Sequence, residues 1–336
     1  MQNSSNATKG HTRIVILYNH PIDTTRSDEQ DTLIQAHFVE DILKQQGHEV
    51  KLLACDLNLM VLQNQLIELK PDLVVNFTEG LNGRGEFIHF PPYLLESLKI
   101  PFTGASAESI YLTSHKLLAK QLLAQHRLPT APWFDANAAN KKIGMRKKKF
   151  IVKSIWEHSS LGLDDSSIVE TTQTKALTQL IQQKSEQLNT PCFAESFIDG
   201  REFNVTLLEQ KNGVKVLAVA EIRFEQFENR HAILSYTAKW DDDSFESTHS
   251  TRHFDFKKQD RPLIAQLKKI SLDCWHLFKL NGYARIDFRI NRQNKPFILE
   301  INANPCLSPD AGFMAAAKKV RLSPEDVISS IIQSAL

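Results

Sequence analysis

The sequence predicts an α/β protein whose N-terminal part is a parallel α/β unit and whose C-terminal part is α+β. Three patterns lead to this prediction. Short apolar runs alternate with helical patterns over the first 77 residues, an alternating strand pattern covers residues 283–302, and helical patterns lie near 260–280 and 323–335. Strands that alternate with helices form parallel sheets, because each connecting helix returns the chain across a face of the sheet.

The N-terminal elements follow one another as β-α-β-α-β. Residues 13–18 form an apolar run typical of a buried strand, and residues 29–46 show helical spacing that ends before Gly47, a common helix stop. The next patterns predict a strand over 49–54, a helix over 59–69 and a strand over 72–77. No Gly-x-Gly-x-x-Gly follows the first strand, so dinucleotide binding is not indicated.

The segment after the third strand combines a glycine-rich loop with a lysine-bearing helix. Residues 78–85 (TEGLNGRG) lie where α/β sheets commonly bind ligands, although a simple connector would have the same composition. Further on, Thr113 or Ser114 is expected to cap a helix that carries Lys116 and Lys120.

Another lysine stands at the end of a predicted strand. The apolar run 150–152 leads into Lys153, and the polar loop 157–162 (EHSSLG) follows. An ammonium group next to backbone N–H groups of a small loop is suited to phosphate. This pattern alone is not specific.

Composition excludes several classes of function. The 336 residues include 40 Lys and Arg against 39 Asp and Glu, so no excess charge favours nucleic acid or a membrane surface. No apolar run is long enough for a transmembrane helix, and the polar residues 1–12 predict a short disordered lead without an export signal. The four cysteines have no metal-binding spacing, which is typical of reduced thiols. We therefore expect a cytoplasmic protein.

The pattern over 283–302 predicts a hairpin that brings two acids together. If the chain turns at Gln293-Asn294, Asp287 lies opposite Glu300 and Arg285 lies opposite Asn302. Directly paired side chains on one face have Cβ atoms about 4.5–5.5 Å apart. Two carboxylates at that distance repel unless a cation lies between them, and oxygen ligands of this kind are suited to Mg²⁺.

An ordinary amphipathic hairpin with solvated charges is the alternative. Simple alternation places Phe297, Leu299 and Ile301 on one face of the second strand. It places Ile298, Glu300 and Asn302 on the other. An acid within the apolar run Phe-Ile-Leu-Glu-Ile favours a functional role, because burying a charge is costly.

Several motifs, in order, resemble the ATP-grasp superfamily and, within it, the D-alanine–D-alanine ligase-like branch. In chain order these are Thr103-Gly104, Lys116, Lys153, Glu157-His-Ser-Ser-Leu-Gly162, Ala194-Glu-Ser-Phe-Ile-Asp-Gly-Arg-Glu-Phe203, Tyr236-Thr-Ala-Lys-Trp240, and the set Arg285, Asp287, Glu300 and Asn302. The resemblance implies an ATP-grasp fold: a pre-ATP-grasp domain over 13–104, a central subdomain over 105–200 and a C-terminal subdomain over 201–336.

The resemblance also implies a role for each motif residue. The expected nucleotide-binding residues are Lys116 and Lys153 for the phosphates, Ser160 and Gly162 with Ser159 for a lid, Glu195, Ser196 and Ile198 for adenine, and Glu202 for ribose. The expected catalytic residues are Arg285, Lys239 and Ser159, and the expected ligands of Mg²⁺ (or Mn²⁺) are Asp287, Glu300 and Asn302.

Departures from the family pattern concern the substrate. Residues 19–25 (NHPIDTT) replace a glycine-rich segment with a glutamate that would hold a substrate ammonium group. Trp240 replaces a tyrosine, so that tyrosine's contacts with a glutamate and a serine are expected to be lost. Cys306 replaces a glycine, and the serine expected beyond it for the substrate carboxylate is not at its usual place.

We therefore expect an ATP- and Mg²⁺-dependent carboxylate–amine ligase that acts through an acyl phosphate on amino-acid or small peptide substrates. One alternative is a D-alanine–D-alanine ligase. An alternative of another class is a nucleotide-binding regulatory protein without ligase activity. The partners expected are small molecules, with neither nucleic acid nor membrane, and the resemblance allows a homodimer.

Overall fold

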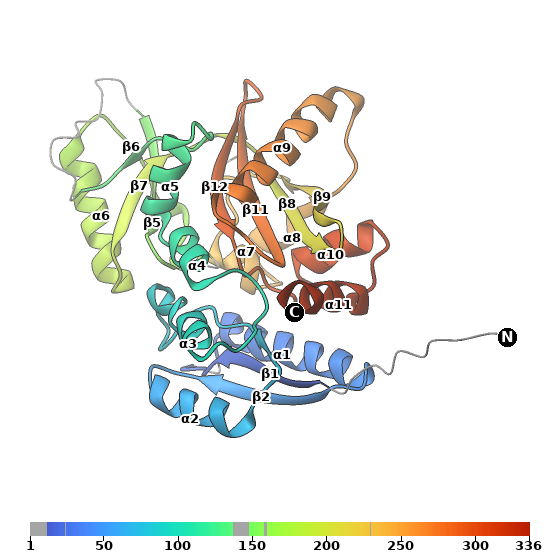
Figure 1. The fold of residues 1–336 in the computed structure, drawn as a ribbon. Coiled ribbons are helices and arrows are strands. Elements are labelled where there is room, and N and C mark those ends of the chain that lie inside the picture. Colours follow the sequence, from blue (N-terminus) through green and yellow to red (C-terminus); the bar gives the residue numbers. More distant parts are fainter. Residues whose placement is uncertain (1–11, 24, 137–147, 158–159, 229) are drawn as a thin grey trace.

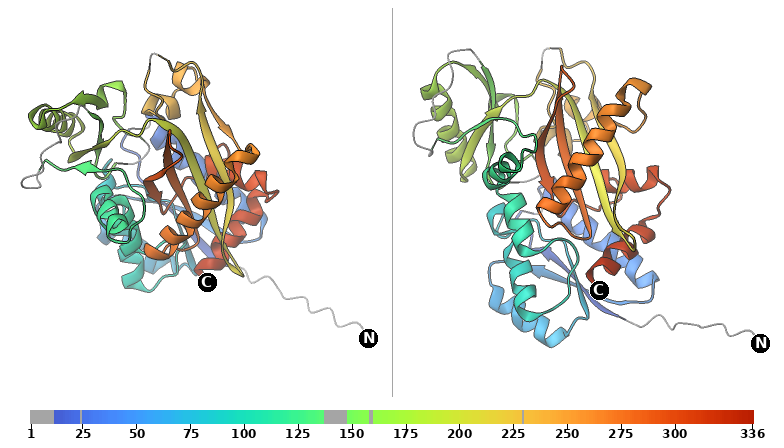
Figure 2. Two further views of the ribbon diagram at one scale, coloured as in Figure 1. Left: turned by 90° about the horizontal axis from the view of Figure 1, so that it is seen from above. Right: turned by 45° about the horizontal axis from the view of Figure 1, so that its top comes forward.

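The computed structural model describes residues 12–23, 25–136, 148–157, 160–228 and 230–336 (Figure 1). The strands of the described residues form three separate sheets. Figure 2 shows the ribbon from two further directions. The sequence lead 1–11 and Ser159 lie outside the described residues. Among the helices that are described, none is long and apolar enough to cross a membrane.

The N-terminal sheet is parallel, with the strand order β2-β1-β3. Its strands are β1 (Arg13–Asn19), β2 (Glu49–Cys55) and β3 (Leu73–Asn76); its helices are α1 (Ser27–Gln45), α2 (Leu59–Leu69), η1 (Gly85–Phe87) and α3 (Phe90–Leu98). Ile14 and Ile16 pack in one core with α1, whereas Val15 and Leu17 pack in another with α2 and α3. The predicted β-α-β-α-β order is confirmed.

The central sheet is antiparallel, with the order β4-β7-β5-β6. After α4 (Ala107–Ser114) and α5 (Lys116–Gln125) come β4 (Trp133–Phe134), β5 (Lys148–Ser154), η2 (Asp165–Ser167), β6 (Ile168–Thr171), α6 (Thr174–Leu188) and β7 (Cys192–Ser196). α6 covers this sheet through Leu177 and Ile181, which pack against Phe150 and Val152.

The structure corrects the expected helix start near Lys116. The hydroxyl of Thr113 donates to the carbonyl of Ser109 at 2.8 Å, because α4 continues to Ser114. The chain becomes extended only at His115, whose Nδ1 accepts from the backbone N–H of Leu118 at 3.2 Å. The prediction that Thr113 or Ser114 caps this helix is wrong.

The C-terminal sheet is antiparallel, with the order β10-β9-β8-β11-β12. Its elements are β8 (Gly200–Gln210), β9 (Gly213–Phe224), α7 (Tyr236–Trp240), α8 (Phe245–Thr248), β10 (Ser250–His253), η3 (Lys258–Asp260), α9 (Arg261–Leu277), β11 (Tyr283–Asn291), β12 (Pro296–Asn302), α10 (Gly312–Lys319) and α11 (Pro324–Ala335). α9 covers one face of this sheet (Figure 1). Phe313 of α10 and Ile331 of α11 share a core with Ile14, which joins the first and last parts of the chain.

The β11–β12 hairpin has the predicted pairing at its functional end. Asp287 lies opposite Glu300, and Arg285 lies opposite Asn302. β8 borders β11 on its other side and places Asn204 opposite Asp287.

A β-bulge corrects the rest of the hairpin. The register shifts between Asp287 and Phe288, so that Phe288 pairs with Ile298 and Leu299 becomes the extra residue. Ile298 and Ile301 are then both buried in the core, while Leu299 and Glu300 both line a cavity. The expectation that Ile298 shares the face of Glu300 is wrong, because simple alternation cannot anticipate an inserted residue.

Candidate active site

A cavity of about 500 Å³ lies where the three parts of the chain meet. It receives side chains from the loops after β3 and β5, from β7, β8 and α7, and from the ends of β11 and β12. The predicted residues that line it are Lys116, Lys153, Ser160, Glu195, Ser196, Ile198, Glu202, Lys239, Arg285, Asp287, Glu300 and Asn302. Gly162 does not line it, and Ser159 lies outside the described residues.

Glu195 binds two lysines at one side of the cavity. Its carboxylate lies 2.6 Å from Nζ of Lys153 and 2.6 Å from Nζ of Lys120. Burial alone would raise the pKa of Glu195, but the two ammonium groups outweigh burial and lower it to about 2. The side chain of Glu195 thus fixes the lysines, a role that the motif alone did not indicate.

A second buried ion pair lies nearby on β8 and β11. Nε of Arg289 is 3.3 Å from Oε2 of Glu202, and the Arg289 guanidinium also donates to the backbone carbonyls of Gly200 and Ala232. Burial nevertheless raises the pKa of Glu202, against the opposing charge of Arg289. Glu202 is therefore held in one position with its carboxylate facing the cavity.

Arg285, Asp287 and Asn302 form a hydrogen-bonded group on the paired strands. Nε and Nη2 of Arg285 each donate to one oxygen of Asp287 at 2.9 Å. Asn302 donates to Asp287 at 3.1 Å, and Asn204 donates to it at 2.7 Å. Burial opposes the charge of Arg285, but Asp287 raises the pKa of that guanidinium further above its usual value.

Glu300 faces a different cation. Its Oε1 lies 3.7 Å from Nζ of Lys116, which also donates to the backbone carbonyl of Glu157 at 2.6 Å. Asp287, Glu300 and Asn302 supply hard oxygen donors from adjacent strands, so this donor set is suited to Mg²⁺. In the protein alone, the positive charges of Arg285 and Lys116 offset the negative charges of Asp287 and Glu300.

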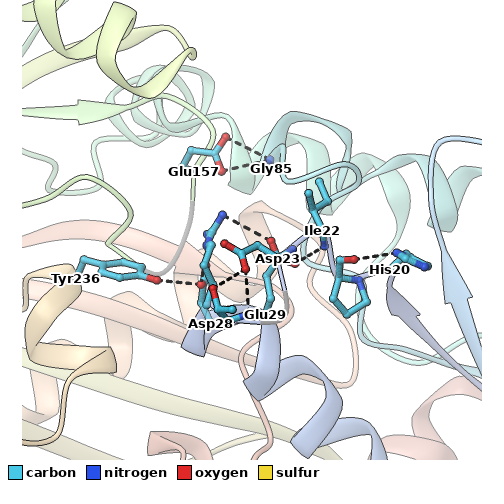
Figure 3. Close-up of polar contacts among 11 residues, drawn as sticks. His20, Ile22, Asp23, Asp28, Glu29, Gly85, Glu157 and Tyr236 are labelled. Carbon is cyan, nitrogen blue, oxygen red and sulfur yellow. Dashed lines mark hydrogen bonds and ion pairs between the residues drawn. The ribbon is translucent and has the colours of Figure 1, made fainter.

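The short helix α7 contacts both the N-terminal unit and the loop after β5. The hydroxyl of Tyr236 donates to Asp28 of α1 at 2.9 Å (Figure 3). Its backbone N–H donates to the carbonyl of Leu163 at 3.2 Å. Ser160 donates to the carbonyl of Leu234, just before α7, at 2.8 Å. Tyr236 thus links α7 to α1 and to the loop after β5, through partners other than the glutamate and serine of the family pattern.

A parallel contact ties the loop after β5 to the N-terminal unit. The carboxylate of Glu157 accepts from the backbone N–H of Gly85 at 3.3 Å (Figure 3). A Cβ atom at Gly85 would lie 2.7 Å from the carbonyl of Trp156, so only glycine permits this approach. The glycine-rich loop 78–85 is therefore part of the cavity wall as well as a connector.

Two acids of the N-terminal unit line the cavity, and sequence reasoning did not identify either. Glu79 follows β3 and Asp31 lies on α1. Burial, with the charges of Asp31 and Asp28, raises the pKa of Glu79 to about 7 against the effect of Lys239 and Arg285. The position of Glu79 after a parallel strand was the available signal.

The loop after Asn302 is held against α1. Ser308 donates to Asp31 at 2.6 Å, and the Cys306 thiol donates to the other oxygen of Asp31 at 3.0 Å. Burial and the charge of Asp31 raise the pKa of Cys306. Ser308 is buried, and its hydroxyl is bound to Asp31.

Comparison with known families assigns the chain. A sequence model of the family described as "D-ala D-ala ligase C-terminus" matches residues 126–333, which is more than half of the chain. The chain belongs to this family. It is accordingly an ATP-dependent ligase that forms C–N bonds, with the ATP-grasp fold.

Individual relatives cover nearly the whole chain. The uncharacterized protein y4sG of Sinorhizobium fredii is 28% identical over 298 residues, which cover 87% of this chain and 84% of that protein. A D-alanine–D-alanine ligase of Aquifex aeolicus is 28% identical over 310 residues, covering 91% and 97%. The structure of a D-alanine–D-alanine ligase of Bacillus anthracis complexed with ATP has a TM-score of 0.69, with 16% identity and 96% coverage of each chain.

Proposed function

We propose that this ligase joins a carboxylate and an amine through an acyl phosphate, on amino-acid or small peptide substrates. The observation that carries the proposal is the Arg285–Asp287–Asn302 group, with Glu300 beside it, in a cavity that also contains lysines. In the first step a substrate carboxylate oxygen attacks the γ-phosphorus of ATP and ADP leaves. The amine then attacks the acyl carbon, and phosphate leaves with the bonding electron pair.

Each side chain has a role that follows from its charge and place. Lys116 and Lys153 would bind phosphate oxygens, and Lys239 would lie beside the transferred phosphoryl group. Arg285 would stabilise the negative charge that develops on the acyl oxygen, because its planar fork is already held by Asp287.

The remaining motif residues complete the nucleotide and metal sites of the proposal. Asp287, Glu300 and Asn302 would hold Mg²⁺, which supplies positive charge next to the phosphates when it is bound. Glu202 would accept hydrogen bonds from the ribose hydroxyls, and the chain at Glu195, Ser196 and Ile198 would contact adenine. Ser160 would belong to the lid over the phosphates.

The central test separates the two chemical steps. The protein is incubated with ATP, Mg²⁺ and each member of a panel of amino acids, with and without hydroxylamine, which converts an acyl phosphate to a hydroxamate. We expect phosphate release, a hydroxamate and, by mass spectrometry, an amide product. ATP binding without phosphate release for any acid would instead favour the regulatory, nucleotide-binding alternative.

We predict that the protein is a poor D-alanine–D-alanine ligase. Asp31 is bound by Cys306 and Ser308, and Trp240 replaces a hydroxyl-bearing side chain, so the groups around the amine differ from the family pattern. A substrate that leaves polar groups of the binding site unpaired loses up to about 10⁴-fold in kcat/KM. D-alanine, L-alanine and a mixed panel are compared as substrates with ATP. Fastest turnover with D-alanine alone would establish the D-alanine–D-alanine ligase reading instead.

A further inference from the structure

Arg252 is a cavity-lining cation that none of the expected roles uses. It lies on β10, opposite Ile222 of β9, and its side chain lines the cavity together with Arg285. Among the residues that the structure describes, Arg252 enters no ion pair. By contrast, Arg223 on the adjacent strand pairs with Glu221 at 3.2 Å.

The start of α10 leaves room for the Arg252 guanidinium. A Cβ atom added at Gly312 would lie 3.3 Å from Nη2 of Arg252. That distance is shorter than an ordinary carbon–nitrogen contact, so a Cβ atom at Gly312 would require the guanidinium to shift by a few tenths of an ångström. The glycine therefore allows Arg252 to lie against the backbone at the cavity wall.

The local charges favour an anion at this place. Burial, and then the positive charge of Arg285, lower the pKa of Arg252, and only Asp310 opposes them. Asp310 is exposed to solvent, which weakens its influence. Two guanidinium groups that share one cavity repel each other, and a carboxylate between or beside them would relieve that repulsion.

We propose that Arg252 is a specificity residue that binds a carboxylate of the amine substrate. The inference rests on the proposed ligase function and narrows the amine to a compound that carries a carboxylate, such as an amino acid or a peptide. Arg252 lines the same cavity as Arg285, the residue proposed to face the acyl oxygen. An amine that attacks beside Arg285 therefore has its carboxylate in the space that Arg252 also lines.

The experiment compares amines that differ only in charge. Each amino acid that the wild-type protein accepts as the amine is assayed beside its carboxamide, with hydroxylamine as a small uncharged amine. We expect the wild-type protein to prefer the amino acid by about 10²-fold or more in kcat/KM. In Arg252→Met the preference should fall to a few-fold through a higher KM for the amino acid, with a much smaller effect on hydroxamate formation.

Three further variants sharpen the test. Arg252→Lys keeps the charge without the fork and should retain part of the preference. Gly312→Ala keeps every charge but shifts the guanidinium by a few tenths of an ångström, so the preference should fall by less than it does in Arg252→Met. Arg223→Met is the matched control, because Arg223 lies on the neighbouring strand and does not line the cavity. It should behave as wild type.

The possible results separate the two claims. A wild-type protein that uses carboxamides as well as amino acids, or an Arg252→Met variant with undiminished preference, overturns the assignment of Arg252. Hydroxamate formation without any amino-acid product also overturns it, while leaving the activation of a carboxylate intact. Failure of wild type to release phosphate or form hydroxamate with any acid refutes the ligase function itself.

Discussion

The charged side chains of the cavity form two groups, the paired half and the unpaired half, which differ in whether the charges form ion pairs. In the paired half, Glu195 binds Lys120 and Lys153, and Glu202 binds Arg289. In the unpaired half, defined by Glu79, Lys239 and Arg252, no member forms an ion pair within the described chain. The paired half is organised before any substrate binds, whereas in the described part of the chain the charges of the unpaired half form no ion pair. In the proposed function, the paired half would hold the nucleotide, and Arg252 of the unpaired half would hold the amine substrate.

Replacing Glu300 should have the largest effect, because its charge acts on both Lys116 and Lys239. Glu300→Gln removes one proposed anionic metal ligand and the partner of Lys116, and we expect turnover to fall by about 10³-fold or more. Turnover is measured over a range of Mg²⁺ concentrations, and circular dichroism checks the fold. Near-normal turnover at limiting Mg²⁺ would remove Glu300 from the metal site.

Arg285→Lys should be the next most severe change. An ammonium group cannot reproduce the two parallel hydrogen bonds to Asp287 or present a planar fork to the acyl oxygen, so we expect kcat to fall by about 10²-fold. ATP affinity should change little, and it is measured by calorimetry beside steady-state kinetics. Weaker ATP binding at unchanged kcat would assign Arg285 to the nucleotide.

The same substitution in the two halves should change stability in opposite directions. In the paired half, Glu195→Gln leaves two buried lysines without their carboxylate and should lower the free energy of unfolding by about 3 kcal/mol near pH 7. The pKa of Glu195 is about 2 in the folded protein, below its unfolded value, so its contribution is present at neutral pH. The deficit of the variant should shrink as the pH falls from about 4 towards 2, as measured by denaturant unfolding. A pH-independent deficit would argue against the ion pairs as its cause.

In the unpaired half, Glu79→Gln should have a smaller and stabilising effect. The folded pKa of Glu79, about 7, exceeds its unfolded value, so the folded state binds more protons and loses stability as the pH rises through about 7. The variant removes this loss. Its melting temperature should exceed that of wild type at pH 8 and approach it at pH 5. A variant that is less stable than wild type at pH 8 would indicate a hidden partner for Glu79.

Local periodicity and the order of motifs determined much of this protein. Alternation over 283–302 predicted that Asp287 lies opposite Glu300, and this pairing is confirmed, although it is set by the bulge at Leu299 and not by a regular turn at Gln293-Asn294. The β-α-β-α-β order followed from apolar spacing in the same way. The ordered motifs placed the expected nucleotide residues on one cavity, apart from Gly162 and the undescribed Ser159.

Tertiary structure alone decided how those residues are used. The bulge at Leu299 sets the register that places Glu300 at the cavity. A regular two-residue alternation in the sequence does not reveal such an inserted residue. Lys120 meets Glu195 across 75 positions of chain, and Asp31 meets Ser308 across 277. Sequence shows that a side chain is charged, but its partner depends on which distant segments the packed cores bring together. For that reason the sequence alone did not single out Glu79 and Arg252. They become candidate functional residues because the fold places both of them in the cavity lining.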